Sequence, residues 1–276
     1  MQPISIVGPG AAALAGDIAG RFDGRVAVVT CDQKAADGGI AAPREAMTAA
    51  NNTRTAISLA DDGTWGGTGT VEGIDELLDG LAPEHDYLVI VGKSRLRVPV
   101  VLLGDDGTSH DDVPGTVVAT GASPDEIDLD ELVANIDTEK PWITRETLVS
   151  RVEADADADR AGAIATFTGR VRARDAPDDD RTTHLAFEKY EGVAADRMEM
   201  IAAELSDRNG VFDVRMHHRT GVIEAGEDIV FVVVLAGHRR EAFRAVEDGI
   251  DRLKDEVPIF KKESTETEEF WVHQRE

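Results

Sequence analysis

Short, continuous apolar runs recur through the first 121 residues, and amphipathic stretches separate them. Uninterrupted apolar runs predict strands that are buried on both faces, and helices between such strands predict parallel connections. The predicted strands are 4–8, 25–30, 86–92, 98–104 and 116–121, with helices over 11–22 and 73–81. The pattern therefore predicts an α/β domain with a mostly parallel sheet.

The pattern changes after Gly121. "SPDE" at 123–126 combines a capping serine, a proline at the first helical position and an acidic residue three places on. This combination predicts a short helix that starts there and reaches Ile136. "DTEKP" at 137–141 is typical of a linker. We therefore predict a first domain over 1–121, a helical linker over 122–140 and a second domain over 141–276.

The second half mixes strands and helices in an α+β order. In the last predicted helix, apolar residues repeat at intervals of three and four and predict one core-facing stripe, Phe243, Val246, Ile250, Leu253 and Val257. The other predicted helices are 143–154 and 193–205, and the predicted strands are 161–173, 184–190, 211–219 and 229–235.

Length and composition favour a two-domain protein of the cytoplasm. At 276 residues, with 42% hydrophobic residues, the chain can build two modest cores. No apolar run is long enough for a membrane span, and the start "MQPISIVGPG" lacks the regions of a secretory signal. Cys31 is the only cysteine, which excludes an internal disulfide and fits a reducing compartment.

Charge is the strongest signal in the composition. The chain holds 54 acidic and 29 basic residues, a formal net charge of -25. A surface this negative repels nucleic acid as a whole. An acidic, lysine-poor surface is what we expect of a protein from a high-salt cytoplasm, and we therefore hypothesise a halophilic protein.

Under this hypothesis, thermal stability rises steeply as KCl reaches molar concentrations, because salt screens the repulsion among surface carboxylates. The measurement is the melting temperature of the full chain across a KCl series. A melting temperature that does not respond to KCl would remove the hypothesis.

The stretch "GPGAAALAG" lies where a phosphate-binding loop would lie, between a first strand and a first helix. A Walker A loop needs a lysine to reach the phosphates and a hydroxyl to hold magnesium. Counted from Gly8, these positions hold Ala13, Leu14 and Ala15, so both groups are missing. We interpret the first domain as a sheet kept for structure or for docking a partner.

This half distantly resembles the MobB-type P-loop protein of molybdenum-cofactor dinucleotide synthesis. The resemblance rests on "ISIVGPG", "RVAVVT" and "DYLVIVGKSRLRVPVVLLG", and it covers about the first 120 residues. It implies a P-loop fold whose Walker A motif is degraded.

Cationic residues gather in the second half, where 20 of the 29 lie. "TFTGRVRARD" places arginines at alternate positions of a predicted strand, "GHRREAF" places His238 and two arginines at the start of a helix, and "LKDEVPIFKK" ends it with lysines. A helix N-terminus flanked by His and Arg favours a phosphate or carboxylate. A lysine held partly out of water is a plausible nucleophile or proton carrier.

Plainer interpretations exist for each of these residues. A lysine in a last helical turn, such as Lys254, often only complements the helix dipole. Strand arginines often pair with surface carboxylates, and His218 on an alternating apolar face fits a core histidine. The histidine spacing matches no common zinc site. The order of the motifs must therefore decide.

That order is similar to the large, catalytic subunit of molybdopterin synthase, the MoaE family. The matching motifs run collinearly from about residue 143 to residue 272. They are "TFTGRVRARD", "FEKYEGVAADRM", "HHRTGVIEAGEDIVFVVV", "GHRREAF", "IDRLKDEVPIFKKE" and "FWV".

The resemblance implies an α/β hammerhead fold that forms a homodimer. A ubiquitin-like sulfur carrier of the MoaD type would bind at each end, giving a heterotetramer, and thread its thiocarboxylate tail into the large subunit. The enzyme would be a sulfurtransferase that adds two sulfurs to cyclic pyranopterin monophosphate and forms the dithiolene of molybdopterin. The resemblance implies no cofactor and no metal in this chain, because molybdenum is inserted later by other proteins.

The resemblance assigns the reacting groups to two lysines. Lys254, in "RLKDEVP", matches the principal catalytic lysine of the family, and Lys261, in "IFKKE", matches the second essential one. Our hypothesis is that Lys254 acts at the reacting centre, by proton transfer or transient covalent attachment. The neighbouring cations would hold the phosphate and stabilise developing negative charge.

The resemblance also implies a substrate pocket. The chain departs from the family at Phe260, where Trp is usual, and in the acidic segment 264–270. The matched residues are Arg172 on the strand, Phe167 as the pocket aromatic, His238 and Arg239 at the anionic site, and Glu263 and Arg219 at further motif positions.

Two other functions stay open. The chain could be a non-catalytic scaffold that docks a ubiquitin-like protein, with its lysines as attachment sites. It could also be a nucleotide-dependent enzyme of cofactor maturation run from residues 1–121, which ATP or GTP binding there would favour. The two lysines together with Arg172 and His238 favour the sulfurtransferase, because a scaffold needs no such pocket.

Overall fold

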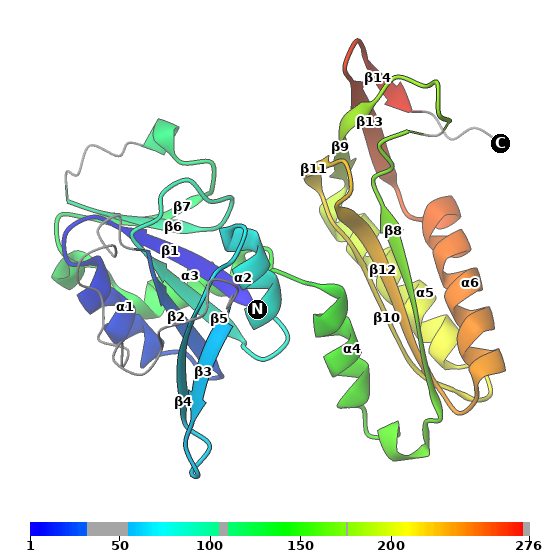
Figure 1. Ribbon diagram of the computed structural model, residues 1–276, viewed down its shortest axis with the longest axis horizontal. Coiled ribbons are helices and arrows are strands. Elements are labelled where there is room, and N and C mark those ends of the chain that lie inside the picture. Colours follow the sequence, from blue (N-terminus) through cyan, green and yellow to red (C-terminus); the bar gives the residue numbers. More distant parts are fainter. Residues whose placement is uncertain (32–54, 105–109, 175, 273–276) are drawn as a thin grey trace. The chain divides into compact units, whose positions relative to one another are not determined.

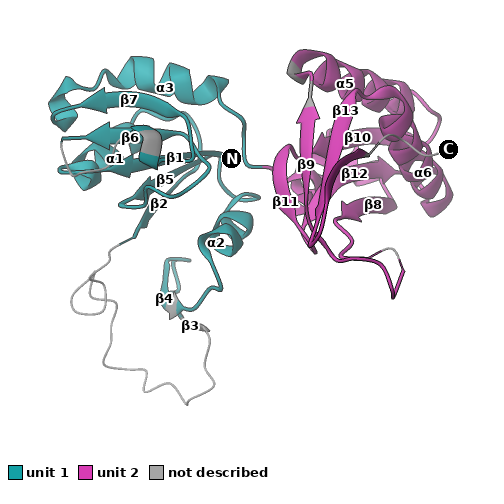
Figure 2. Cartoon of the chain, turned by 90° about the horizontal axis from the view of Figure 1, so that it is seen from above, with its two compact units in different colours: residues 1–142 teal, residues 143–276 magenta. Residues whose placement is uncertain are grey.

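The computed structural model describes residues 1–31, 55–104, 110–174 and 176–272. The chain divides into two compact units, 1–142 and 143–276, each with a hydrophobic core of its own (Figure 2). Among the described residues, no helix is both long and apolar enough to cross a membrane.

A five-stranded, all-parallel sheet forms the centre of the first unit (Figure 1). Helices α1 (Ala11–Ala19) and α3 (Leu129–Thr138) pack on one face of the sheet, and α2 (Ile74–Leu81) packs on the other. Burial on both faces explains the uninterrupted apolar strands, and the predicted parallel sheet is confirmed. In spatial order the strands are β2 (Val26–Thr30), β5 (Tyr87–Val91), β1 (Gln2–Val7), β6 (Val100–Leu103) and β7 (Val117–Gly121).

The helix within the predicted linker 122–140 packs in the core of the first unit. Ser123 makes no side-chain capping bond, and only a short 3-10 turn follows it. Helix α3 starts later, where the Asp128 carboxylate accepts hydrogen bonds from the first turn. Leu132 and Ile136 of this helix are buried against the sheet. The unit therefore extends to Trp142, whose amide donates to the carbonyl of Met1 at 2.8 Å.

A β-hairpin in the first unit is absent from the predicted elements. It consists of β3 (Thr55–Leu59) and β4 (Trp65–Gly69), which pair antiparallel as a two-stranded sheet of their own (Figure 1). Its second strand reads "WGGTG", which lacks the β-branched or alternating pattern of a strand. Ile57, Leu59 and Trp65 are all exposed, so burial leaves no signature in the sequence here.

The second unit contains two antiparallel sheets. Helices α5 and α6 share a core with both sheets, and α4 covers the other face of the three-stranded sheet. The three-stranded sheet has the order β10 (Val211–His218), β12 (Asp228–Ala236), β8 (Ala163–Arg170). The four-stranded sheet has the order β11 (Gly221–Glu224), β9 (Thr182–Lys189), β13 (Ile259–Thr265), β14 (Glu269–Val272). The helices are α4 (Arg145–Glu153), α5 (Glu191–Ser206) and α6 (Arg239–Glu256).

Helix α6 returns along the strand that precedes it. Strand β12 ends at Ala236, two residues reverse the chain, and the helix then runs back beside β12 and β8 (Figure 1). Its buried stripe contains Ile250 and Leu253 as predicted, but the predicted Phe243 is 64% exposed. The stripe passes through small residues that hydrophobic spacing underweights, Ala242, Ala245 and Gly249.

Candidate functional site

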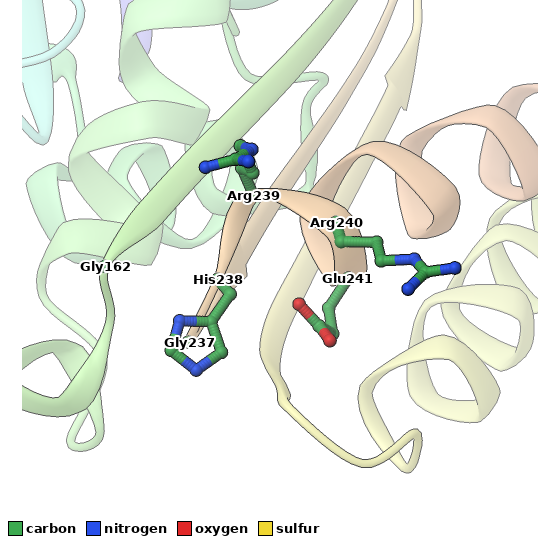
Figure 3. A pocket seen from close by; sticks show the side chains of 6 residues that line it. All are labelled: Gly162, Gly237, His238, Arg239, Arg240 and Glu241. Carbon is green, nitrogen blue, oxygen red and sulfur yellow. The ribbon is translucent and has the colours of Figure 1, made fainter.

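A hollow of about 520 Å³ opens at the N-terminus of α6. His238 is the N-cap residue, and Arg239 and Arg240 begin the first turn, with their side chains spread around the hollow (Figure 3). The free amides and the dipole of an eighteen-residue helix add partial positive charge at the same place. The hollow is therefore suited to a phosphate or a carboxylate. Its lining residues are Gly162, Gly237, His238, Arg239, Arg240 and Glu241.

Two glycines bring backbone segments together at this hollow. The amide of Gly162 donates to the Ala236 carbonyl at 3.1 Å, and the amide of Gly237 donates to the Gly210 carbonyl at 2.9 Å. A Cβ on Gly162 would lie 2.6 Å from the carbonyl oxygen of Gly237, closer than real contacts allow. The start of β8 can approach the turn before α6 only because residue 162 has no side chain.

The cations of the hollow are unusual for this chain. Within the described part of the chain, His238, Arg239 and Arg240 make no side-chain hydrogen bond or ion pair, although carboxylates outnumber cations almost two to one. Glu241 is the one carboxylate among the lining residues, and one of its oxygens is buried without a hydrogen-bond partner. Three side chains remain available to bind an incoming anion.

The predicted lysines lie at the other end of the unit. Lys254 is in the last turn of α6 and is exposed in the single chain. Lys261 is on β13, directly opposite Phe187 of β9, and is partly buried. Strand β8 ends at Arg170, so Arg172 follows the strand instead of lying on it. Arg170 pairs with Asp228 at the start of β12. Because α6 runs back along β12, the start of β12 and the C-terminus of α6 lie at the same end of the unit. Arg172 and Lys254 are therefore both at that end.

The remaining predicted residues have structural contacts. Phe167 lies against the core shared with α5 and α6 and is partly exposed. The Thr182 hydroxyl donates to Glu263 at 2.5 Å, and this bond ties β9 to β13. The Arg219 guanidinium donates to the Asp228 carbonyl at 2.9 Å. Glu263 and Arg219 therefore hold strand ends, while Phe167 can reach both the core and the surface.

One chain does not bring all the predicted residues together. His238 and Lys254 lie sixteen positions apart at opposite ends of α6, and a rise of 1.5 Å per residue separates their Cα atoms by about 24 Å. From the sequence we predict both residues in one pocket, and the length of the helix shows that a single chain does not bring them together. Lys254, Lys261 and Arg172 lie toward one end of the unit, and His238 and Arg239 lie at the other.

A cluster of ion pairs fixes the last turns of α6. The Arg252 guanidinium donates to Glu256 at 2.7 Å and to Glu204 of α5 at 2.7 Å, and Arg197 of α5 also pairs with Glu256. The hydrogen bond from Arg252, together with that from Arg197, lowers the pKa of the Glu256 carboxyl below its usual value. The cluster joins α5 to α6 on both sides of Lys254 in the sequence.

Replacing Glu256 with Gln should make stability less dependent on acid pH. A carboxyl with a lowered folded pKa stabilises the protein above its unfolded pKa, and this contribution disappears as pH falls through the folded pKa. The variant should therefore be less stable at neutral pH and approach the parent protein in acid, as measured by urea unfolding over a pH series. Glu247→Gln, an exposed carboxyl on the same helix, is the matched control and should leave the profile unchanged. A parallel loss at every pH would contradict the role of the ion pairs.

The loop at the phosphate-loop position of the first unit packs tightly against its neighbours. A Cβ on Gly8 would lie 1.9 Å from the Leu103 carbonyl oxygen, and one on Gly10 would lie 2.7 Å from the ring of Pro124. Both glycines have positive φ, which side chains rarely adopt. The glycines therefore serve close packing between the loop and its neighbours. In the described part of the chain, no group of three His, Cys, Asp or Glu residues is placed to hold a metal ion.

Known proteins match this chain both in its second unit and along its whole length. The family model described as MoaE protein matches residues 139–256. A probable molybdopterin synthase of Haloferax volcanii is 50% identical over 275 residues, and the match covers 100% of both chains. The molybdopterin synthase catalytic subunit of Pyrococcus abyssi is 40% identical over 111 residues, which is 40% of this chain and 74% of that protein. The solved molybdopterin synthase of Staphylococcus aureus shares 32% identity over 42% of this chain and 83% of its own, with a TM-score of 0.40.

Proposed function

Because this chain belongs to the molybdopterin synthase family, we propose that it transfers sulfur from a thiocarboxylated, ubiquitin-like carrier to cyclic pyranopterin monophosphate. The observation that carries this proposal is the 50% identity with a probable molybdopterin synthase along the whole chain. The chain is a sulfur-transferring enzyme of molybdenum-cofactor biosynthesis. Substrate, carrier and the roles of single residues are the parts that we propose.

The charges of the second unit suit this chemistry. A thiocarboxylate and a phosphorylated pterin are both anions, and an acidic protein must concentrate cations wherever it receives them. We assign the phosphate to His238 and Arg239, whose side chains are available in the hollow at the start of α6. We assign the reacting centre to Lys254, with Lys261 and Arg172 stabilising negative charge that develops during transfer.

These two groups of residues work together if the enzyme is a homodimer. About 24 Å separates His238 from Lys254 in one chain, too far for both to contact one small substrate. In a twofold dimer, the start of α6 of one copy can lie beside the end of α6 of the other. Each site then combines the lysines of one chain with the His238–Arg239 pair of its partner, and two carriers complete a heterotetramer.

We assign the second unit to the α/β hammerhead fold and the first to a MobB-like fold. The MobB-like assignment of the first unit rests on a first parallel strand followed by a glycine loop and a helix. Because the loop is packed against Leu103 and Pro124, we propose a structural or docking role for the first unit rather than nucleotide hydrolysis. The acidic surface supports a halophilic, cytoplasmic enzyme.

The decisive assay mixes the full chain with thiocarboxylated carrier and cyclic pyranopterin monophosphate in molar KCl. Molybdopterin should form in amounts that rise with added carrier. If the carrier binds and no molybdopterin appears, the non-catalytic scaffold becomes the better interpretation. If the carrier does not bind, both interpretations fail.

Replacing Gly162 with Ala should weaken substrate binding. The new methyl group meets the Gly237 carbonyl oxygen at 2.6 Å and must displace the turn that carries His238. We expect the KM for the pterin to rise roughly tenfold with a modest loss of stability, about 1–3 kcal/mol for overpacking. Gly192→Ala, at a position in α5 with no neighbour within 4 Å, is the matched control; it should leave the KM unchanged and should not lower stability, because alanine favours a helix more than glycine does. An unchanged KM in Gly162→Ala would place the substrate elsewhere.

A further inference from the structure

The loop between β5 and β6 carries basic residues on an acidic unit. Lys93, Arg95 and Arg97 are exposed, while Leu96 and Val98 are buried in the core beneath α2. Residues 1–142 contain 9 basic and 24 acidic residues, a formal net charge of -15. Three cations within five residues therefore stand out from their surroundings.

The backbone of this loop is held in place. Gly92 has a φ of +83°, and its amide donates to the Ile6 carbonyl at 2.9 Å. A Cβ at Gly92 would lie 2.8 Å from the carbonyl oxygen of Cys31, so a larger residue does not fit. The hydroxyl of Ser5, a buried polar residue within β1, donates to the Lys93 carbonyl at 2.5 Å. Together with the buried Leu96, these contacts fix where the cations emerge.

Two of the cations have no internal partner. In the described ranges, the side chains of Lys93 and Arg95 form neither ion pairs nor hydrogen bonds. By contrast, Arg21 lies 2.6 Å from Asp130, and Arg25 contacts Asp86. In a unit with so many carboxylates, unpaired cations on a fixed loop are consistent with a partner that supplies the carboxylates from outside.

Separate exposed cations favour a protein surface over a small ligand. Lys93, Arg95 and Arg97 occupy alternate positions of the loop and are all exposed, so their charges are spread along it rather than gathered at one point. At the carboxyl edge of the sheet, where small ligands of α/β proteins bind, the loop after β1 packs tightly at Gly8 against Leu103 and at Gly10 against Pro124. A row of carboxylates on a protein matches the spacing of the cations better.

We propose that Lys93 and Arg95 form a docking surface for an acidic face of the sulfur carrier. This inference rests on the proposed function, which requires such a carrier. A carrier from the same high-salt compartment would share the surplus of carboxylates, so the two proteins would repel each other except where cations are exposed. At molar salt the screening length is about 3 Å, and only pairs in direct contact still attract.

The test compares full-length Lys93→Gln/Arg95→Gln with the parent protein in molar KCl. We expect the Kd and the KM for the carrier to rise roughly fivefold, since two contact pairs at a surface are lost, while kcat at saturating carrier stays unchanged. The matched control is Arg21→Gln/Arg25→Gln, which removes the same charge from paired arginines of the same unit. The control should bind the carrier like the parent protein.

Equal carrier affinity in the Lys93→Gln/Arg95→Gln variant and the parent protein would overturn this inference and leave the proposed function intact. An equal loss in the control would also overturn it, because net charge rather than this surface would then be responsible. A parent protein that neither binds the carrier nor forms molybdopterin would instead refute the proposed function.

Discussion

Replacing Lys254 with Ala is expected to slow dithiolene formation by roughly 10³-fold, the usual effect of removing a group that transfers protons or attacks a carbonyl. Lys254 is an exposed residue in the last turn of α6, so its removal leaves no cavity in the core. Carrier affinity should stay nearly unchanged, because most of a protein interface lies outside one side chain. Single-turnover formation of molybdopterin, with carrier binding measured separately, tests both parts.

Lys262→Ala is the control for this experiment. Neighbouring residues of a strand point to opposite faces, so Lys262 faces away from Lys261. Its ammonium lies 2.8 Å from the Glu269 carboxylate and 5.9 Å from the centre of the Trp271 ring. These contacts give Lys262 a structural role. Activity should therefore survive in Lys262→Ala. Full turnover in Lys254→Ala would defeat the catalytic assignment, whatever the control shows.

The sheet of the first unit could be predicted because burial on both faces imposes a composition. The inner strands β5 and β6 are buried along nearly all their length, and their residues are almost all branched or aliphatic. The β3–β4 hairpin could not be found in this way. Its apolar residues Ile57 and Leu59 are exposed, and the glycines of β4 give no strand pattern. A pattern that depends on burial carries no information about an exposed element.

Boundaries and faces were harder to predict for a related reason. The motif at Ser123 satisfies the sequence rule for a helix start, yet Asp128 caps α3. In α6 the spacing of large residues points to Phe243, while the helix buries Ala242 and Gly249. Small residues allow close approach to the sheet, and a count of large apolar side chains does not see them. Local rules identify the element, and tertiary packing decides its ends and its face.

In the candidate site, too, sequence motifs predict some residues and the fold is needed to find others. Motif order predicts Lys254, Lys261, Arg172 and His238 as site residues, and His238 is among the residues that line the hollow at the start of α6. Gly162 also lines that hollow, and it could be found only from the fold, because it meets Gly237 across 75 residues of sequence. The separation of Lys254 from His238 follows from helical rise alone once both are placed on one helix. That separation gives the second large prediction.

Mixing two inactive variants should restore activity. An Arg239→Ala chain keeps its lysines, and a Lys254→Ala chain keeps its arginine, so a dimer of the two contains one intact site if each site draws on both chains. With random exchange half of the dimers are mixed and each has one working site of two, so about a quarter of parental activity should return. Each variant alone should stay near zero, and molybdopterin formation after subunit exchange is the measurement.

Lys254→Ala mixed with Lys261→Ala distinguishes this arrangement from simple rescue by mixing. Both lysines lie toward the same end of one chain, so each site takes Lys254 and Lys261 from the same copy. In the mixed dimer every copy lacks one of the two lysines, and activity should not return. If Arg239→Ala and Lys254→Ala form mixed dimers that stay inactive, the site does not combine the two ends of α6 across copies. Recovery in the two-lysine mixture would instead place Lys254 and Lys261 in different sites. Inactive mixed dimers in the first experiment would separate the hollow from the chemistry, because the length of α6 prevents one chain from joining His238 and Lys254.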